Sequence, residues 1–165
     1  LKFCQLPGLI SQSDIWQSAD SMSYGGVIPF GKKAILKLIL AGYKRYGFKT
    51  VKLKVGGSLN DDVARVKLAR QILGDEATLR IDANCAWTVD QAKWSLAAFR
   101  PYNIASCEQP LPASDLPGLS ELTATVPEAI MVDESLTTLD QAQELIDRKA
   151  CNAFNIRLSK VDIHF

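Results

Sequence analysis

The amino-acid sequence predicts an α/β fold, namely an incomplete parallel (β/α) TIM-type barrel with about six strands. Two observations support this prediction. First, short apolar runs of strand length alternate with amphipathic stretches of helix length. Second, charged residues end five successive apolar runs at intervals of 25 to 28 residues, close to the length of one strand–helix unit. Parallel strands would bring those five charges to one rim of the barrel, where barrel enzymes keep their active sites.

The expected strands are short runs rich in aliphatic residues and bounded by turn-forming residues. They are residues 23–29, 50–55, 78–84, 104–109, 129–134 and 153–159. In the second run, Val51, Leu53 and Val55 alternate with Lys52 and Lys54. Successive side chains of a strand point to opposite faces, so the aliphatic face would meet the helices and the charged face would point into the barrel.

Each expected helix follows a strand and has a recognisable start or end. The helices are residues 32–46, 61–73, 88–99, a short one within 116–125, and 139–148. Gly47 is placed to close the first, and Thr88 and Thr138 are suitable N-caps for the third and fifth. The last helix is expected to pack inward through an apolar stripe, Ala142, Leu145 and Ile146.

The bulk composition excludes several classes of function. With 47% hydrophobic residues, 22% charged residues and a net charge of +1, the chain has no electrostatic attraction to nucleic acid or an anionic membrane. No apolar run approaches the roughly 18 residues of a membrane span. The four cysteines lack CxxC spacing, which favours free thiols in a cytoplasmic protein. His164 is the only histidine, which excludes histidine-based triads and zinc sites.

The sequence predicts one domain and a lead-in segment. Residues 1–22 show no clear period and contain several turn formers, whereas residues 23–165 carry the strand–helix alternation. A complete eight-stranded barrel has about 250 residues, so we expect this chain to be part of a longer protein.

Three of the rim charges are carboxylates from successive strands: Asp82, Glu108 and Asp133. Hard oxygen donors without histidine or cysteine favour Mg²⁺, with Mn²⁺ as an alternative. A single carboxylate at a strand end often caps the next helix instead, but three in a row with lysines on either side favour a metal site.

Three lysines accompany these carboxylates. Lys52 and Lys54 share one face of their strand, and adjacent cations make it easier for one amine to lose its proton and act as a base. Lys160 follows a strand four positions further round the barrel and would approach a substrate from the opposite side. Two bases on opposite faces suit removal of a proton on one side and its return on the other.

Together these motifs resemble the barrel domain of the enolase superfamily, in the muconate-lactonizing-enzyme (mandelate racemase/muconate cycloisomerase) subgroup. The resemblance covers about residues 23–160. It consists of a K-x-K pair, Asp-x-Asn, Glu, Asp-Glu and Lys on successive strands, here Lys52/Lys54, Asp82/Asn84, Glu108, Asp133/Glu134 and Lys160.

The resemblance implies a Mg²⁺-dependent isomerase or lyase that removes the α-proton of a small carboxylate substrate through an enediolate. Lys54 and Lys160 would be the acid/base pair, and Lys52 would tune Lys54 and contact the substrate carboxylate. Asn84 and Glu134 would support the metal ligands or contact the substrate. No organic cofactor is implied, and the full-length protein is expected to form homo-oligomers.

The resemblance leaves the substrate open among cycloisomerases, o-succinylbenzoate synthases, N-acylamino acid racemases and dipeptide epimerases. It also implies that residues 1–22 lead in from an N-terminal capping domain. A hypothesis of a different class is that the chain is an inactive, truncated barrel fragment. A P-loop-like run at residues 26–33 is rejected because Lys33 stands where a P-loop needs Ser or Thr.

Overall fold

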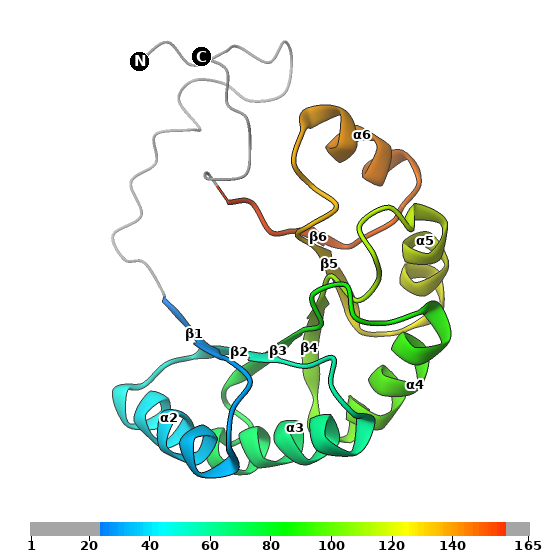
Figure 1. Cartoon of the computed structure of the whole chain (residues 1–165). Coiled ribbons are helices and arrows are strands. Elements are labelled where there is room, and N and C mark those ends of the chain that lie inside the picture. The colour runs from blue at the N-terminus through cyan, green and yellow to red at the C-terminus, as the bar shows by residue number, and fades with distance from the viewer. Residues whose placement is uncertain (1–23, 158–165) are drawn as a thin grey trace, which may run out of the picture.

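The computed structural model describes residues 24–157 and contains one six-stranded parallel sheet. The strands lie in chain order, each paired with the next, and helices connect them along the outer side of the curved sheet (Figure 1). The strands are β1 Gly25–Ile28, β2 Thr50–Lys54, β3 Thr78–Asp82, β4 Ile104–Glu108, β5 Ala129–Val132 and β6 Ala153–Phe154. The helices are α2 Lys33–Tyr46, α3 Leu59–Leu73, α4 Val89–Phe99, the 3₁₀ turn η1 Arg100–Tyr102, α5 Leu116–Thr125 and α6 Leu139–Asp147. This is the expected strand–helix winding of an incomplete (β/α) barrel.

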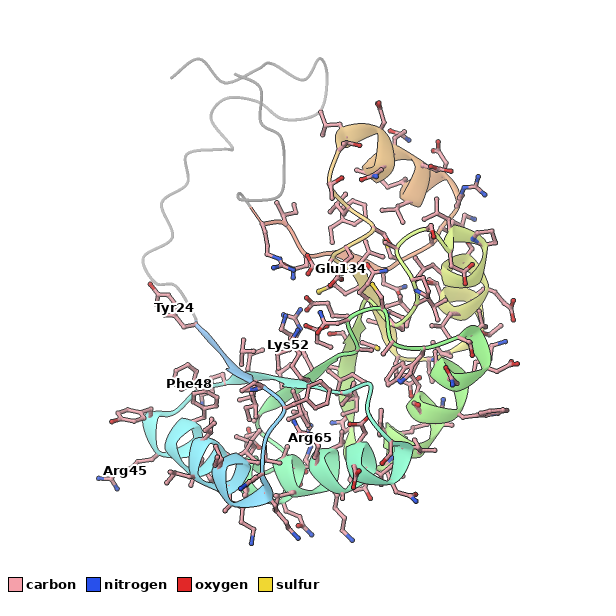
Figure 2. All side chains as sticks on the ribbon, in the orientation of Figure 1. Tyr24, Arg45, Phe48, Lys52, Arg65 and Glu134 are labelled. Carbon is pink, nitrogen blue, oxygen red and sulfur yellow. The ribbon has the colours of Figure 1, made fainter. Side chains whose placement is uncertain are left out.

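The hydrophobic core lies between the sheet and the helices. Val51, Leu53, Leu79 and Ile81 are fully buried on the helix-facing side of β2 and β3. The intervening positions carry the polar side chains, and Figure 2 shows Lys52 and Glu134 on the inner side of the curved sheet. The predicted division into an aliphatic outer face and a charged inner face is therefore confirmed for these strands.

Local capping fixes where the helices begin and end. Thr88 and Thr138 each accept a hydrogen bond from the backbone N–H of the glutamine three positions further on. The side chain of that glutamine accepts a hydrogen bond from the backbone N–H of the threonine, which completes a capping box. Gly47 ends α2 in the left-handed conformation, with φ of 78°. The caps predicted at these three positions are confirmed.

Three details differ from the sequence-based expectations. Ile146 is 56% exposed, so it does not belong to the inner stripe of α6, which packs through Leu145 with Ala142 half-buried beside it. One residue along a helix turns the side chain by about 100°, which carries Ile146 out of the interface. In addition, β3 ends at Asp82 and β5 at Val132, so Asn84 and Asp133 lie in the turns that follow. Within the described residues 153–157 of the expected strand 153–159, β6 spans only Ala153–Phe154.

Several expectations fall on residues outside the described range. These are the lead-in segment 1–22, Lys160 and His164, and nothing about them is tested. Within residues 24–157, no helix is long and apolar enough to cross a membrane. Within this range, Cys107 and Cys151 are free thiols.

Candidate active site

The carboxyl ends of β2, β3 and β4 place three of the predicted residues in one row. Lys54 pairs in register with Asp82, and Asp82 pairs with Glu108. Met131 of β5 is the register partner of Glu108, and Asp133 follows Met131 by two residues on the same strand path. Because neighbouring strands run parallel, their carboxyl ends meet at one rim, and the charged side chains gather there.

The two lysines of β2 contact the carboxylates of β3 and β4. Lys52 Nζ lies 2.9 Å from both oxygens of Glu108 and 3.2 Å from Asp82 Oδ2. Lys54 Nζ lies 2.9 Å from Asp82 Oδ2 and also donates to Asn84 Oδ1. The carboxylates are almost completely buried, whereas the lysine side chains keep 20% and 28% of their surface exposed. The positively charged amines thus compensate the negative charges of the buried carboxylates, and they remain partly accessible on the inner side of the sheet.

Glu108 receives further hydrogen bonds from residues of β3 and of the segment after β6. Arg80 Nη2 lies 3.4 Å from Glu108 Oε2, and Asn155 Nδ2 donates to Glu108 Oε1 at 2.7 Å. With Lys52 added, both carboxylate oxygens are engaged, which fixes the orientation of the side chain. Asn155 was not predicted as a site residue.

Asp133 is fully buried and pairs with Arg157, which the sequence reasoning also missed. Arg157 Nε donates to Asp133 Oδ1 at 3.0 Å, and the guanidinium also contacts Oδ2. A usable signal existed, because alternation in the expected strand 153–159 places Asn155 and Arg157 on one face. A buried carboxylate requires a cation, so a basic residue on that face was a reasonable partner for Asp133.

Asn84 and Glu134 connect the loops after β3 and β5. Asn84 Nδ2 donates to Glu134 Oε1 at 3.0 Å, while Asn84 Oδ1 accepts from Lys54. The Asn84 backbone N–H also donates to Asp82 Oδ1 at 3.1 Å. The structure thus brings seven of the eight predicted site residues to one rim, and the eighth, Lys160, lies outside the described range.

A metal ion was predicted for the three carboxylates. Their donor chemistry and strand positions fit Mg²⁺, which prefers carboxylate oxygens. Among residues 24–157, however, no group of three or more His, Cys, Asp or Glu side chains is placed to hold an ion. Each carboxylate instead contacts a basic side chain, so a metal would have to compete with Lys52, Lys54 and Arg157 for the same oxygen atoms.

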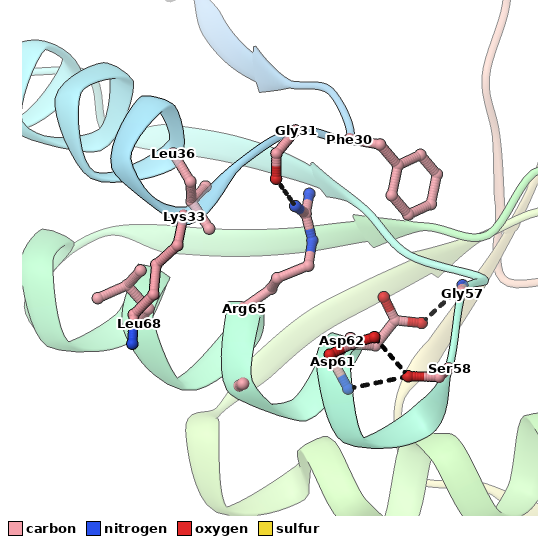
Figure 3. Close-up of a pocket in the computed structure, with 11 residues that line it drawn as sticks. Phe30, Gly31, Lys33, Leu36, Gly57, Ser58, Asp61, Asp62, Arg65 and Leu68 are labelled. Atoms are coloured by element: carbon pink, nitrogen blue, oxygen red, sulfur yellow. Dashed lines mark hydrogen bonds between the residues drawn. The ribbon is translucent and has the colours of Figure 1, made fainter.

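A separate pocket of about 350 Å³ lies beside the loops after β1 and β2 (Figure 3). Its lining includes Phe30, Gly57, Asp62 and Arg65 and none of the candidate metal ligands. Asp62 Oδ2 accepts from the backbone N–H of Gly57 at 2.9 Å and of its neighbour Gly56 at 2.8 Å. Burial raises the pKa of the Asp62 carboxyl, and hydrogen bonds from the two glycines offset part of that rise.

Arg65 ties this pocket to the end of β2. Its guanidinium lies 5.2 Å from the centre of the Phe30 ring and donates to the carbonyl oxygens of Pro29 and Lys54, at 3.1 Å and 3.3 Å. Burial lowers the pKa of the Arg65 guanidinium, although it stays charged. The pocket therefore lies around Arg65, which holds the end of β2 at Lys54, and not at the rim where the candidate site residues gather.

Comparison with known proteins agrees with this arrangement. The family model described as enolase C-terminal domain-like matches residues 35–162, most of the chain. The chain belongs to this family. Its similarity extends to the D-Ala-D/L-Ala epimerase of Cytophaga hutchinsonii, 42% identical over 71% of this chain and 32% of the relative. The hydrophobic dipeptide epimerase of Enterococcus faecalis is 40% identical over 70% of this chain and 33% of the relative.

Solved structures of this enolase-type family have the same fold. The dipeptide epimerase of Cytophaga hutchinsonii, complexed with Mg and the dipeptide D-Ala-L-Val, superposes with a TM-score of 0.82 at 34% identity. The alignment covers 87% of this chain and 39% of that structure. The chain spans about a third of the length of the curated relatives that it matches. These relatives are epimerases, and the expected membership of the enolase superfamily is confirmed.

Proposed function

We propose that the full-length protein is a Mg²⁺-dependent isomerase that removes and returns the α-proton of a carboxylate substrate. The observation that carries this proposal is the row of Lys54, Asp82 and Glu108 across three adjacent strands, in a chain of the enolase family. Packing alone does not account for buried carboxylates and partly exposed amines that gather at the open rim of a sheet.

In this mechanism Lys54 takes the α-proton, and Lys160 is assigned the opposite face of the substrate. Lys52 contacts the substrate carboxylate and keeps it beside Lys54. Asp82, Glu108 and Asp133 would hold Mg²⁺, which when bound supplies the positive charge that stabilises the developing enediolate. Positioning of the base next to a fixed carboxylate accounts for much of the expected rate enhancement.

The proposed substrate is a dipeptide. Support comes from curated relatives named D-Ala-D/L-Ala epimerase, hydrophobic dipeptide epimerase and L-Ala-D/L-Glu epimerase, which share 36–42% identity with this chain over about 70% of its length. Cycloisomerisation is a weaker candidate because the muconate cycloisomerase of Acinetobacter lwoffii is 34% identical over 68% of the chain. Epimerisation requires only proton removal and return, which the two-lysine arrangement can supply.

A second candidate is an inactive barrel fragment. One observation favours it. Asp82, Glu108 and Asp133 each contact a lysine or an arginine, and among residues 24–157 no group of three or more acidic, histidine or cysteine side chains is placed to hold a metal ion. Furthermore, β1 and β6 each pair on one side only within the described sheet, and such edges invite association with another copy.

A direct experiment tests the proposed epimerase activity. The full-length protein is incubated with Mg²⁺ and L-Ala-L-Glu or D-Ala-L-Ala in D₂O, and the α-proton signals are followed by NMR. The proposed enzyme exchanges the α-proton of one residue for deuterium and forms the epimer. If neither dipeptide exchanges with Mg²⁺ present, epimerisation of this substrate class is excluded.

A further inference from the structure

Gln109 lies at the carboxyl end of β4, directly after Glu108, and its side chain is completely buried. Its backbone adopts a left-handed conformation with φ of 37°, which residues other than glycine rarely adopt. The backbone N–H of Gln109 donates to Met131 O at 2.8 Å, so the chain stays joined to β5 beyond the last residue of β4.

The side-chain amide of Gln109 forms four hydrogen bonds. Its Oε1 accepts from the backbone N–H of Asp133 at 3.0 Å and of Ser135 at 3.1 Å. Its Nε2 donates to Leu111 O at 2.9 Å and to Ser135 Oγ at 2.8 Å. Backbone N–H groups can only donate and a carbonyl can only accept, so these partners fix which end of the amide faces which loop.

These bonds attach the turn after β5 to the turn after β4. Asp133 follows β5 and Glu108 ends β4, so Gln109 fixes the backbone of one candidate metal ligand relative to the other. We propose that Gln109 is a positioning residue that sets the separation of Glu108 and Asp133 and thereby the Mg²⁺ affinity of the rim. This inference rests on the proposed function, because it presumes that both carboxylates bind the ion.

A purely structural role for Gln109 is the competing explanation, and Arg70 provides a matched control. Arg70 is likewise buried and donates to four backbone carbonyls at 2.7–2.9 Å, those of Gly74, Ala77, Tyr102 and Asn103. Those carbonyls lie at the opposite ends of the strands, because residue 77 precedes β3 and residue 103 precedes β4. Gln109→Met and Arg70→Met therefore remove the same number of hydrogen bonds from the two ends of the sheet.

The test uses calorimetric titration of Mg²⁺ into the full-length protein, with urea unfolding of every variant. We expect both variants to unfold at lower urea concentration, and only Gln109→Met to bind Mg²⁺ more weakly, by about 10–100-fold. Ser135→Ala removes one partner of the amide and is the milder variant, with an affinity loss in the same direction. If Gln109→Met does not fold, the Mg²⁺ affinity of Ser135→Ala decides whether Gln109 positions the two carboxylates.

The possible results separate this inference from the proposed function. If wild type binds Mg²⁺ and Gln109→Met or Ser135→Ala binds it equally well, Gln109 does not position the ligands and the proposed function stands. The same conclusion follows if Arg70→Met weakens binding as much as Gln109→Met. If the wild-type protein itself does not bind Mg²⁺, both the inference and the proposed function are overturned.

Discussion

Lys54 Nζ lies 2.9 Å from Asp82 Oδ2, across a register pair that joins β2 to β3. The candidate base and the candidate metal ligand therefore compensate each other's charge. Since the carboxylate is almost completely buried and the amine is partly exposed, the amine is the group that can move toward a substrate. Mg²⁺ at Asp82 would compete with Lys54 for the same oxygen and thereby free the amine.

Replacement of Lys54 tests its assignment as the base. We expect Lys54→Met to lower kcat for epimerisation by about 10²–10⁴-fold, the usual contribution of general acid–base catalysis, with a smaller change in KM. Lys93→Met is the control, because Lys93 of α4 forms a surface ion pair with Glu121 of α5 at 2.6 Å and contacts none of the rim residues in the described hydrogen bonds. Steady-state kinetics with equal losses in both variants would argue against Lys54 as the base.

The raised pKa of Asp62 makes the stability of the folded protein depend on pH. Burial disfavours the charged carboxylate, so the folded state binds the proton more tightly than the unfolded chain, whose carboxyl has the ordinary pKa of 3.8. The stability that this group contributes is complete below pH 3.8 and is lost as pH rises through the raised folded-state pKa. Asp62→Asn should accordingly have a higher Tm than wild type at neutral pH, and the difference should vanish in acid.

Thermal unfolding of both proteins across the acid-to-neutral range checks this prediction. Asp90→Asn serves as the control, since Asp90 is an exposed aspartate in the first turn of α4. A difference in Tm for Asp62→Asn that stays constant with pH, or grows on acidification, would contradict the assigned direction of the pKa shift.

The thiol of Cys107 should be unreactive in the folded protein. Complete burial raises the pKa of Cys107 well above its usual value, and the nearby Asp82 and Glu108 raise it further, so the nucleophilic thiolate is scarce. We expect iodoacetamide to modify the half-buried Cys151, whose pKa burial raises less, before Cys107 in native protein and both at similar rates in urea. Mass spectrometry of timed samples measures this, and equal native rates would contradict it.

Gly56 should not tolerate a side chain. Its φ of 112° lies outside the range of other residues, and an added Cβ would lie 2.7 Å from the Cβ of Ala86. We expect Gly56→Ala to lower the free energy of unfolding by about 1–3 kcal/mol, measured by urea denaturation. Gly31→Ala is the matched control, because a Cβ there meets nothing within 4 Å, and it should change stability little.

The sequence predicted much of the fold because alternation of apolar and charged residues determines which face of each strand is buried. It did not predict the exposure of Ile146, since the inward face of the nine-residue α6 depends on how the helix sits against its neighbours. The expected strand ends at Asn84 and Glu134 are each two residues too late, since β3 ends at Asp82 and β5 at Val132. At Asn84 the polar alternation of Arg80 and Asp82 continues after the strand has ended.

The sequence predicted those site residues whose position follows from the order and spacing of the strands. Chain order and spacing placed Lys54, Asp82 and Glu108 at one rim. Arg157 was missed as the partner of Asp133, because the alternation of residues 153–159 indicates on which face Arg157 lies but does not show which carboxylate it reaches. The four hydrogen bonds of Gln109 could not be predicted either, because they depend on how the turns after β4 and β5 lie relative to each other. The roles assigned to the site residues remain predictions.

Binding of Mg²⁺ to the full-length protein tests the central claim most directly. Titration calorimetry of wild type is compared with Asp82→Asn, which removes one candidate ligand charge, and with Asp90→Asn, an exposed position on α4. We predict that wild type and Asp90→Asn bind with equal affinity and that Asp82→Asn binds at least about 10–100-fold more weakly. Equal affinity in all three proteins, or no binding by wild type, would contradict the account.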